Sequence, residues 1–136
     1  MKGIIAAVGL TLTITLLAST AGAATQGYIQ HWNLDDMTFD GRLKPSSGAT
    51  QQITHGRLYG VDITTREKMT FLTKMDKVMP GKNGTFAEFA DNQYVIMATD
   101  GQDVIGELVS AGMARVNGSC TIDICQSWRL RQSRVK

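Results

Sequence analysis

The sequence predicts a small α+β protein in which a closed five-stranded barrel is accompanied by about three helices. Three observations support this. The chain has 136 residues, which suits one domain. It is 43% hydrophobic and 19% charged with two prolines, which excludes disordered and collagen-like chains. Its patterns run in the order three strands, helix, two strands, helix, short strand, helix. Several short strands with one inserted helix are typical of a Greek-key barrel of the OB type.

The first 23 residues have the pattern of a secretory signal peptide. Lys2 precedes an apolar run of about 15 residues, and Ala21-Gly22-Ala23 supplies the small-x-small cleavage pattern. The alternative is an uncleaved membrane anchor, but a spanning helix needs about 20 apolar residues. We therefore expect cleavage after Ala23, a domain of residues 24–136 without a later membrane span, and an exported protein, periplasmic or secreted, of bacterial type.

Strand patterns fill the first half of the domain. Residues 27–34 alternate between apolar and polar side chains and predict a strand. Asp40-Gly41 is typical of a hairpin turn, because glycine tolerates a positive φ. Residues 44–49 form a loop by composition, and residues 51–61 predict a third strand.

The first helix of the domain is predicted to begin at a capping box, Thr64-x-x-Glu67, and to end before Pro80-Gly81. Apolar residues, mostly methionine, recur along it at helical spacing. We interpret them as core residues, with a ligand groove as the alternative. These positions are Met69, Leu72, Met75 and Met79.

The second half of the domain mixes strands and helices. Residues 85–89 and 93–99 predict strands, residues 102–111 a helix, and residues 113–116 a short strand. A final helix contains Trp128 and ends in basic residues, for which we expect a solvated face, with contact to a phosphate backbone or an anionic surface as the alternative. The basic residues are Arg129, Arg131, Arg134 and Lys136.

Two cysteines, Cys120 and Cys125, lie in the exported part of the chain. In an oxidising compartment a close, even pair predicts a disulfide bond. Free thiols and a metal site are the alternatives, although a zinc site needs four nitrogen or sulfur ligands and no histidine is near. We expect the disulfide to hold the start of the last helix.

The charge of the chain limits its partners. A formal charge of +2, from 14 Lys and Arg against 12 Asp and Glu, excludes holding nucleic acid by bulk attraction alone. His31 and His55 are isolated, and we expect no catalytic role for them. Some aromatic residues could stack single-stranded bases, but we expect core packing for at least half of them. These are Tyr28, Trp32, Tyr59 and Tyr94.

Three motifs point to a known family. Residues 95–116 contain Asp-Gly followed by x-x-Val-x-x-x-Leu-Val-x-x-Gly-x-Ala-x-Val. Residues 57–62 read Arg-Leu-Tyr-Gly-Val-Asp, and Cys125-x-x-Trp128 lies near the end. On these motifs the chain resembles the staphylococcal nuclease-like (thermonuclease) family over nearly the whole domain. The resemblance implies an OB barrel and a calcium-dependent phosphodiesterase.

The resemblance also implies site residues, and the set is incomplete. Family members hold calcium with two carboxylates, activate water with a glutamate and bind phosphate with two arginines. Arg57 matches the first arginine and Asp62 one calcium-binding carboxylate. Thr65 stands at the position of the glutamate, and Asn92 at that of the second arginine.

Two positions leave alternatives open. The other calcium-binding carboxylate falls at Met37, although a one-residue bulge would place Asp36 there. Glu67 lies two residues after Thr65 and could replace the missing glutamate, although it also fits the predicted capping box.

These losses predict an exported nuclease-like protein that is catalytically impaired and acts as a binding module for nucleic acid or an envelope protein. Threonine is no base at ordinary pH, and loss of a positioned base costs about 10²–10⁴ in rate. The alternative is an active calcium-dependent nuclease with relocated acids, and a weaker one is a structural subunit of an envelope machine. No cofactor is expected, except calcium if the nuclease site functions. The relocated set would comprise Arg57, Asp62, Glu67 and one of Asp35, Asp36 or Asp40.

Overall fold

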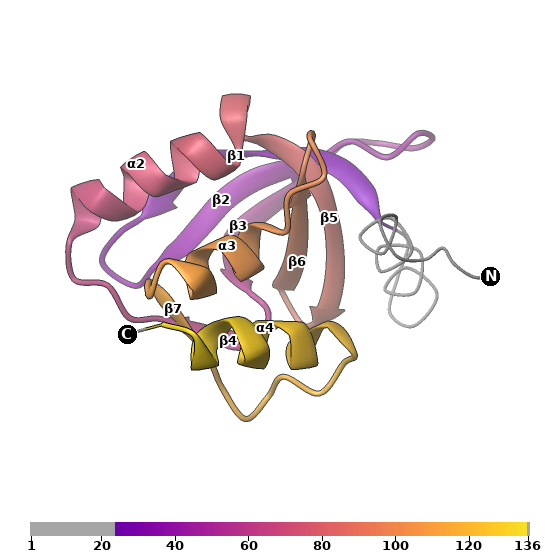
Figure 1. The fold of residues 1–136 in the computed structure, drawn as a ribbon. Coiled ribbons are helices and arrows are strands. Elements are labelled where there is room, and N and C mark those ends of the chain that lie inside the picture. The colour runs from indigo at the N-terminus through magenta and orange to yellow at the C-terminus, as the bar shows by residue number, and fades with distance from the viewer. Residues whose placement is uncertain (1–23, 136) are drawn as a thin grey trace.

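The computed structural model describes residues 24–135. The predicted signal peptide and Lys136 lie outside them. The strands are β1 (Thr25–Asn33), β2 (Thr38–Leu43), β3 (Gln51–Leu58), β4 (Val61–Ile63), β5 (Asn83–Ala90), β6 (Gln93–Ala98) and β7 (Ala114–Val116). The helices are α2 (Lys68–Val78), the 3₁₀ turn η1 (Pro80–Lys82), α3 (Val104–Ser110) and α4 (Ile124–Ser133) (Figure 1).

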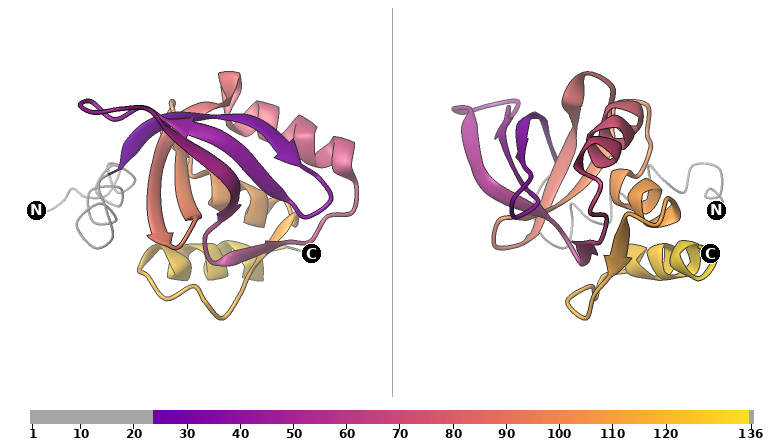
Figure 2. Two further views of the ribbon diagram at one scale, coloured as in Figure 1. Left: turned by 180° about the vertical axis from the view of Figure 1, so that it is seen from behind. Right: turned by 90° about the vertical axis from the view of Figure 1, so that its left-hand side faces the viewer.

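Within these residues five strands close into a barrel in the order β1-β2-β3-β6-β5. β1, β2 and β3 pair antiparallel, β6 joins β3 in parallel, and β5 pairs antiparallel with both β6 and β1. β4 and β7 form a separate two-stranded sheet. α3 and α4 lie on the side of the barrel away from β1 and β2 (Figure 2), whereas α2 packs against β1, where Phe71 meets Trp32. The predicted fold class, a small α+β barrel of OB type with three helices, is confirmed.

Aromatic rings fill the barrel. The rings of Phe39, Phe86 and Tyr94 are buried, with centroids 5.9, 6.1 and 6.2 Å apart. The apolar stripe of α2 is divided: Met75 is buried as predicted, whereas Met69 is 71% exposed. The buried face of α2 consists of Phe71, Met75 and Val78, and it shields the barrel core from solvent.

A buried carboxylate joins α3 to α4. Asp103 is 3% exposed and precedes α3, where its Oδ1 accepts the Gly106 N–H at 3.0 Å. Its Oδ2 accepts the indole N–H of Trp128 from α4 at 2.7 Å. Burial raises the pKa of Asp103, an effect that these two hydrogen bonds and Arg131 oppose. Both carboxylate oxygens are therefore used, and two helices depend on one side chain.

The predicted start of the first helix is wrong. α2 begins at Lys68, and Glu67 precedes it without a side-chain capping bond. Instead the Thr65 hydroxyl accepts the Glu67 N–H at 3.2 Å. Such a local turn competes with helix formation, so the capping box at Thr64 does not form.

The predicted hairpin at Asp40-Gly41 is also wrong. Both residues lie inside β2, and the turn between β1 and β2 spans residues 34–37. Asp40 faces a bulge of β3, where its Oδ1 accepts the N–H of His55 at 3.0 Å. Gly41 permits close strand approach, because a Cβ there would lie 2.5 Å from the Tyr28 carbonyl oxygen.

The predicted third strand, residues 51–61, is divided into β3 and β4. The chain turns at Gly60, whose φ of 73° favours glycine. A Cβ on Gly60 would lie 2.6 Å from the Cys120 sulfur. The loop that follows β7 therefore packs against this corner through a position that only glycine fits.

The cysteine pair has the predicted arrangement. Cys120 and Cys125 lie at disulfide-bonding distance with their Cα atoms 5.8 Å apart, and Cys125 is in the first turn of α4. This pair fits an oxidising compartment. None of the helices within residues 24–135 has the length and hydrophobicity that a membrane crossing requires.

We expect Trp128→Phe to lower the free energy of unfolding by about 1.5–3 kcal/mol, because it leaves one oxygen of the buried Asp103 carboxylate without a donor. Urea denaturation measures this. Leu130→Ala, at a side chain 55% exposed, is the control and should change stability little. Equal stability of Trp128→Phe and the parent would show that the bond does not hold the helices together.

Candidate functional site

An open hollow of about 430 Å³ lies at one end of the barrel. The β1–β2 turn, the end of β3, β4 and the loop after β7 meet there, and the first three can be followed in Figure 2. Arg57 and Asp62 share the lining with both Met37 and Asp36, the two alternatives for the second carboxylate position. The full lining is Asp35, Asp36, Met37, Arg57, Leu58, Val61, Asp62, Ile63, Gln93, Asn117 and Ser119.

Glu67 and Thr65 are not in this lining. Glu67 is exposed at the position before α2, and the Thr65 hydroxyl accepts its backbone N–H. The side chain proposed as a replacement base and the threonine at the family's glutamate position therefore both lie outside the lining of the hollow.

Asp36 is held by its own turn. Its Oδ1 accepts the Thr38 hydroxyl at 2.7 Å and the Thr38 N–H at 3.2 Å, and its Oδ2 lies 3.5 Å from Nδ1 of His55. The Thr38 hydroxyl, above all, lowers the pKa of Asp36, and His55 and Arg57 add smaller electrostatic effects. A carboxylate with a lowered pKa is a weaker base, which makes Asp36 poorly suited to activating water.

The other charged groups of the hollow differ in their partners. Asp35 is fully exposed and lies 3.5 Å from the Lys68 ammonium. Asp62 accepts a hydrogen bond from Asn117 at 3.1 Å. Among residues 24–135, Arg57 has no carboxylate within 4.0 Å of its guanidinium. This guanidinium is the group most available to an incoming ligand.

The donor set does not fit a calcium ion. Calcium takes six to eight oxygen ligands. Met37 offers no side-chain oxygen, and the Oδ1 of Asp36 is occupied by Thr38. Between residues 24 and 135 there is no group of three or more His, Cys, Asp or Glu side chains that could hold a metal. We therefore derive no reaction step through calcium.

Asn92 has a structural role that the sequence did not reveal. It forms the β5–β6 turn with a φ of 57°, and its Nδ2 donates to the carbonyls of Thr54 at 2.8 Å and His55 at 3.0 Å. Its own carbonyl accepts the Arg57 N–H at 3.0 Å. Asn92 therefore joins the β5–β6 turn to β3 through its side-chain amide and its backbone carbonyl.

A second network that the sequence did not reveal surrounds Asp40. Its Oδ2 lies 3.1 Å from Nε2 of His31, and its Oδ1 accepts Asn33 Nδ2 at 3.1 Å as well as the His55 N–H. The His55 N–H, above all, lowers the pKa of Asp40. The two histidines are isolated along the chain, but each lies beside a carboxylate of β2 or of the β1–β2 turn, His31 beside Asp40 and His55 beside Asp36. No local sequence pattern could have shown these contacts.

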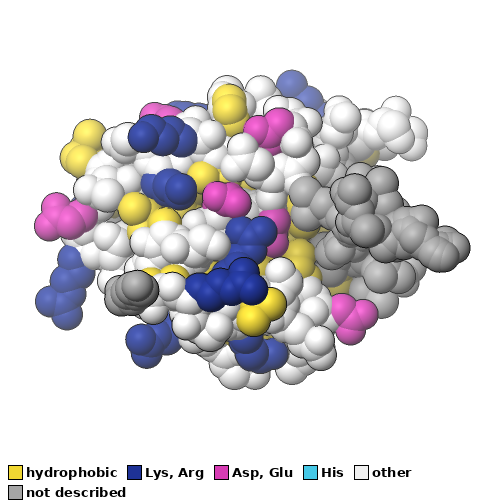
Figure 3. Space-filling model, in the orientation of Figure 1, with side chains coloured by type: hydrophobic (Ala, Val, Ile, Leu, Met, Phe, Trp, Pro, Cys, Tyr) yellow, Lys and Arg dark blue, Asp and Glu magenta, His cyan; other side chains and the backbone are white. Residues whose placement is uncertain are grey.

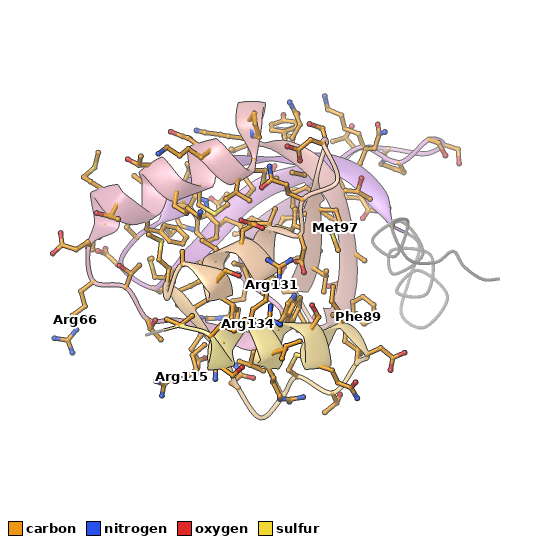
Figure 4. The ribbon with its side chains drawn as sticks, viewed as in Figure 1. Arg66, Phe89, Met97, Arg115, Arg131 and Arg134 are labelled. Atoms are coloured by element: carbon orange, nitrogen blue, oxygen red, sulfur yellow. A yellow bond between two sulfur atoms is a disulfide. The ribbon has the colours of Figure 1, made fainter. Side chains whose placement is uncertain are left out.

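The basic residues of α4 are only partly free. Arg129 donates to the Cys120 carbonyl at 2.8 Å, and Arg131 donates to Glu107 at 3.2 Å. Arg134 is exposed. Arg131 and Arg134 lie on the helical side of the protein (Figure 4), where basic atoms gather at the centre of the face (Figure 3).

The aromatic residues do not form a common platform. Tyr59 and Tyr94 are 4% and 5% exposed, and burial raises the pKa of Tyr94 to about 12. The ring of Tyr28 lies under the ammonium of Lys44, 4.9 Å away. Core packing of at least half of these rings is therefore confirmed.

Comparisons with known proteins add nothing to this geometry. No family model, curated protein or solved structure matches the chain. The function is therefore inferred from the chemistry of the hollow and from the motifs of the sequence.

We expect Thr38→Val to raise the pKa of Asp36 towards its ordinary value of 3.8, as measured by NMR titration. The ionised Asp36 stabilises the fold above its unfolded pKa, and this contribution is lost as the pH falls through the lower folded value. The stability deficit of the variant that arises from Asp36 should therefore be present at neutral pH and vanish in acid. Thr54→Val, at an exposed position of β3, should leave the Asp36 titration unchanged.

We expect Asn92→Ala to lower the free energy of unfolding by about 1–3 kcal/mol, because two backbone carbonyls of β3 lose their donor and alanine is strained at positive φ. Asn92→Gly, which removes only the hydrogen bonds, should lose less. Chemical denaturation of both variants measures the difference, and a harmless Asn92→Ala would contradict the proposed role.

Proposed function

We propose that the protein is a divergent, exported member of the thermonuclease-like family that no longer cleaves nucleic acid and binds a protein of the cell envelope at the hollow. The observation that carries this proposal is the charge of the lining. Among the described residues, three carboxylates, of Asp35, Asp36 and Asp62, share the lining with a single guanidinium, that of Arg57.

The lack of a suitable base supports the loss of catalysis. A general base must reach the water or hydroxyl that it deprotonates. Glu67 is outside the lining, and the pKa of Asp36 is lowered. Asn92, at the position of the second arginine, is committed to the backbone of β3. Phosphate would therefore meet one guanidinium instead of a pair.

The charge balance favours a protein over nucleic acid as the partner. Nucleic acid binding depends on cations that neutralise phosphates, and the three carboxylates in the same lining as Arg57 oppose it. A polypeptide can offer a carboxylate to Arg57 and donors to the surrounding carboxylates at the same time. Gln93, Asn117 and Ser119 add uncharged polar groups to this lining.

Export is part of the proposal. It rests on the signal pattern of the sequence and on the cysteine pair at bonding distance, which suits an oxidising compartment. An envelope protein is the class of partner that such a compartment provides.

An active nuclease is the second candidate, because Asp35 and Asp36 share the hollow with Arg57 and Asp62. One of these acids would then activate water in place of the missing glutamate. A cleavage assay separates the two functions.

We expect the purified domain to leave plasmid and single-stranded DNA intact in the presence of calcium, with an active nuclease as the positive control. Cleavage that is lost in Arg57→Ala and in Asp36→Asn or Glu67→Gln would instead establish the nuclease. Filter binding at about 50 and 200 mM salt should show only weak, salt-sensitive binding of DNA.

We also expect Arg57→Glu to abolish crosslinking of the protein to its partner in envelope preparations. Lys77→Glu, a charge reversal on the exposed face of α2, is the matched control and should crosslink normally. Equal crosslinking of both variants would place the partner elsewhere on the surface.

A further inference from the structure

A second hollow of about 250 Å³ lies between α2 and β1 and shares no residue with the candidate site. Apolar side chains make most of its wall, and three titratable side chains stand among them. The apolar wall is Ile29, Trp32, Leu72, Met75 and Met79, and the titratable side chains are His31, Asp76 and Lys82.

The wall is held rigidly. The ring of Trp32 packs edge-on against Phe71 at 4.9 Å and against Phe39 at 5.4 Å. Met75 and Met79 are 5% and 1% exposed, so their thioethers are fixed by the core behind them. The half-buried side chains of Trp32 and Leu72 provide the apolar surface of the wall, backed by the buried methionines.

The hollow contains both a negative charge, on Asp76, and a positive charge, on Lys82, and neither group forms an ion pair within the described residues. Within the described part of the chain, neither Asp76 nor Lys82 has an oppositely charged group within 4.0 Å. His31 already faces Asp40 at 3.1 Å. One carboxylate and one ammonium are therefore left for a ligand.

We propose that this hollow binds a free α-amino acid with a large apolar side chain. The apolar side chain of the ligand packs against Trp32 and Leu72, its ammonium group meets Asp76, and its carboxylate meets Lys82. The proposal does not depend on the function of the candidate site.

Size and charge together select this class of ligand. Sites for drug-sized molecules occupy about 300–1,000 Å³, so a hollow of about 250 Å³ suits a smaller molecule. A fatty acid would bring a carboxylate towards Asp76, and an alkylamine would bring an ammonium towards Lys82. Only a zwitterion with an apolar body satisfies both groups.

The fluorescence of Trp32 tests the proposal, because the other indole, Trp128, is fully buried and contributes a constant background. The probes are L-leucine, N-acetyl-leucine, which lacks the ammonium, leucinamide, which lacks the carboxylate, and octanoate. Calorimetry of the same titrations provides a second readout that does not depend on the indole.

We expect L-leucine to bind and the other three probes to bind at least about tenfold more weakly, since each loses a charge-assisted contact. Asp76→Asn and Lys82→Gln should each weaken leucine binding by a similar factor. Lys77→Gln, on the exposed face of α2, is the matched control and should bind leucine as the parent does.

Absence of leucine binding by both methods would overturn the proposal. So would octanoate or leucinamide binding as tightly as leucine, or leucine binding that is unchanged in both Asp76→Asn and Lys82→Gln. Arg57→Glu, which alters only the candidate site, should bind leucine normally, so that failure of one proposal is separable from failure of the other.

Discussion

The Asp103 carboxylate supports much of the helical side of the molecule. It accepts one N–H from α3 and the indole N–H of Trp128 from α4, so that α4 is placed by a bond formed inside the core. From α4, Cys125 and Arg129 both reach back to Cys120. The loop between β7 and α4 places Asn117 and Ser119 in the wall of the hollow. The shape of the candidate site therefore depends on a buried hydrogen bond that lies outside it.

The barrel architecture does not depend on the particular residues that line the hollow, and some polar side chains in or beside it also hold turns. An OB barrel is stabilised by inward-facing rings and by strand closure, neither of which requires a particular residue at the barrel end. The side chain of Asn92 stabilises strand pairing, since it donates to two carbonyls of β3. Thr38 takes up one oxygen of Asp36. These polar side chains therefore stabilise turns of the barrel.

Local patterns predicted most of the fold, whereas the candidate site residues came from the family resemblance of the motifs. Strand alternation and helical spacing depend on near neighbours, and most strands and helices of the barrel were predicted from them. The cysteine pair was predicted from its close spacing and the expected export. The prediction of a turn at Asp40-Gly41 was wrong because the same dipeptide can occupy a hairpin turn or a strand position opposite a β-bulge. Only the pairing of β2 with β3 distinguishes the two cases. The His31–Asp40 contact and the role of Asn92 join residues on different strands, so no spacing along the chain could have indicated them.

The barrel closes where β3 meets β6, and this joint consists of two residue pairs, Arg57 with Gln93 and Leu58 with Tyr94. Three of these four residues also line the hollow. A ligand in the hollow would therefore contact the two strands whose pairing closes the barrel. Ligand binding in the hollow and separation of β3 from β6 are then thermodynamically linked. A ligand that contacts both strands favours the paired state, and weaker strand pairing lowers the affinity for the ligand.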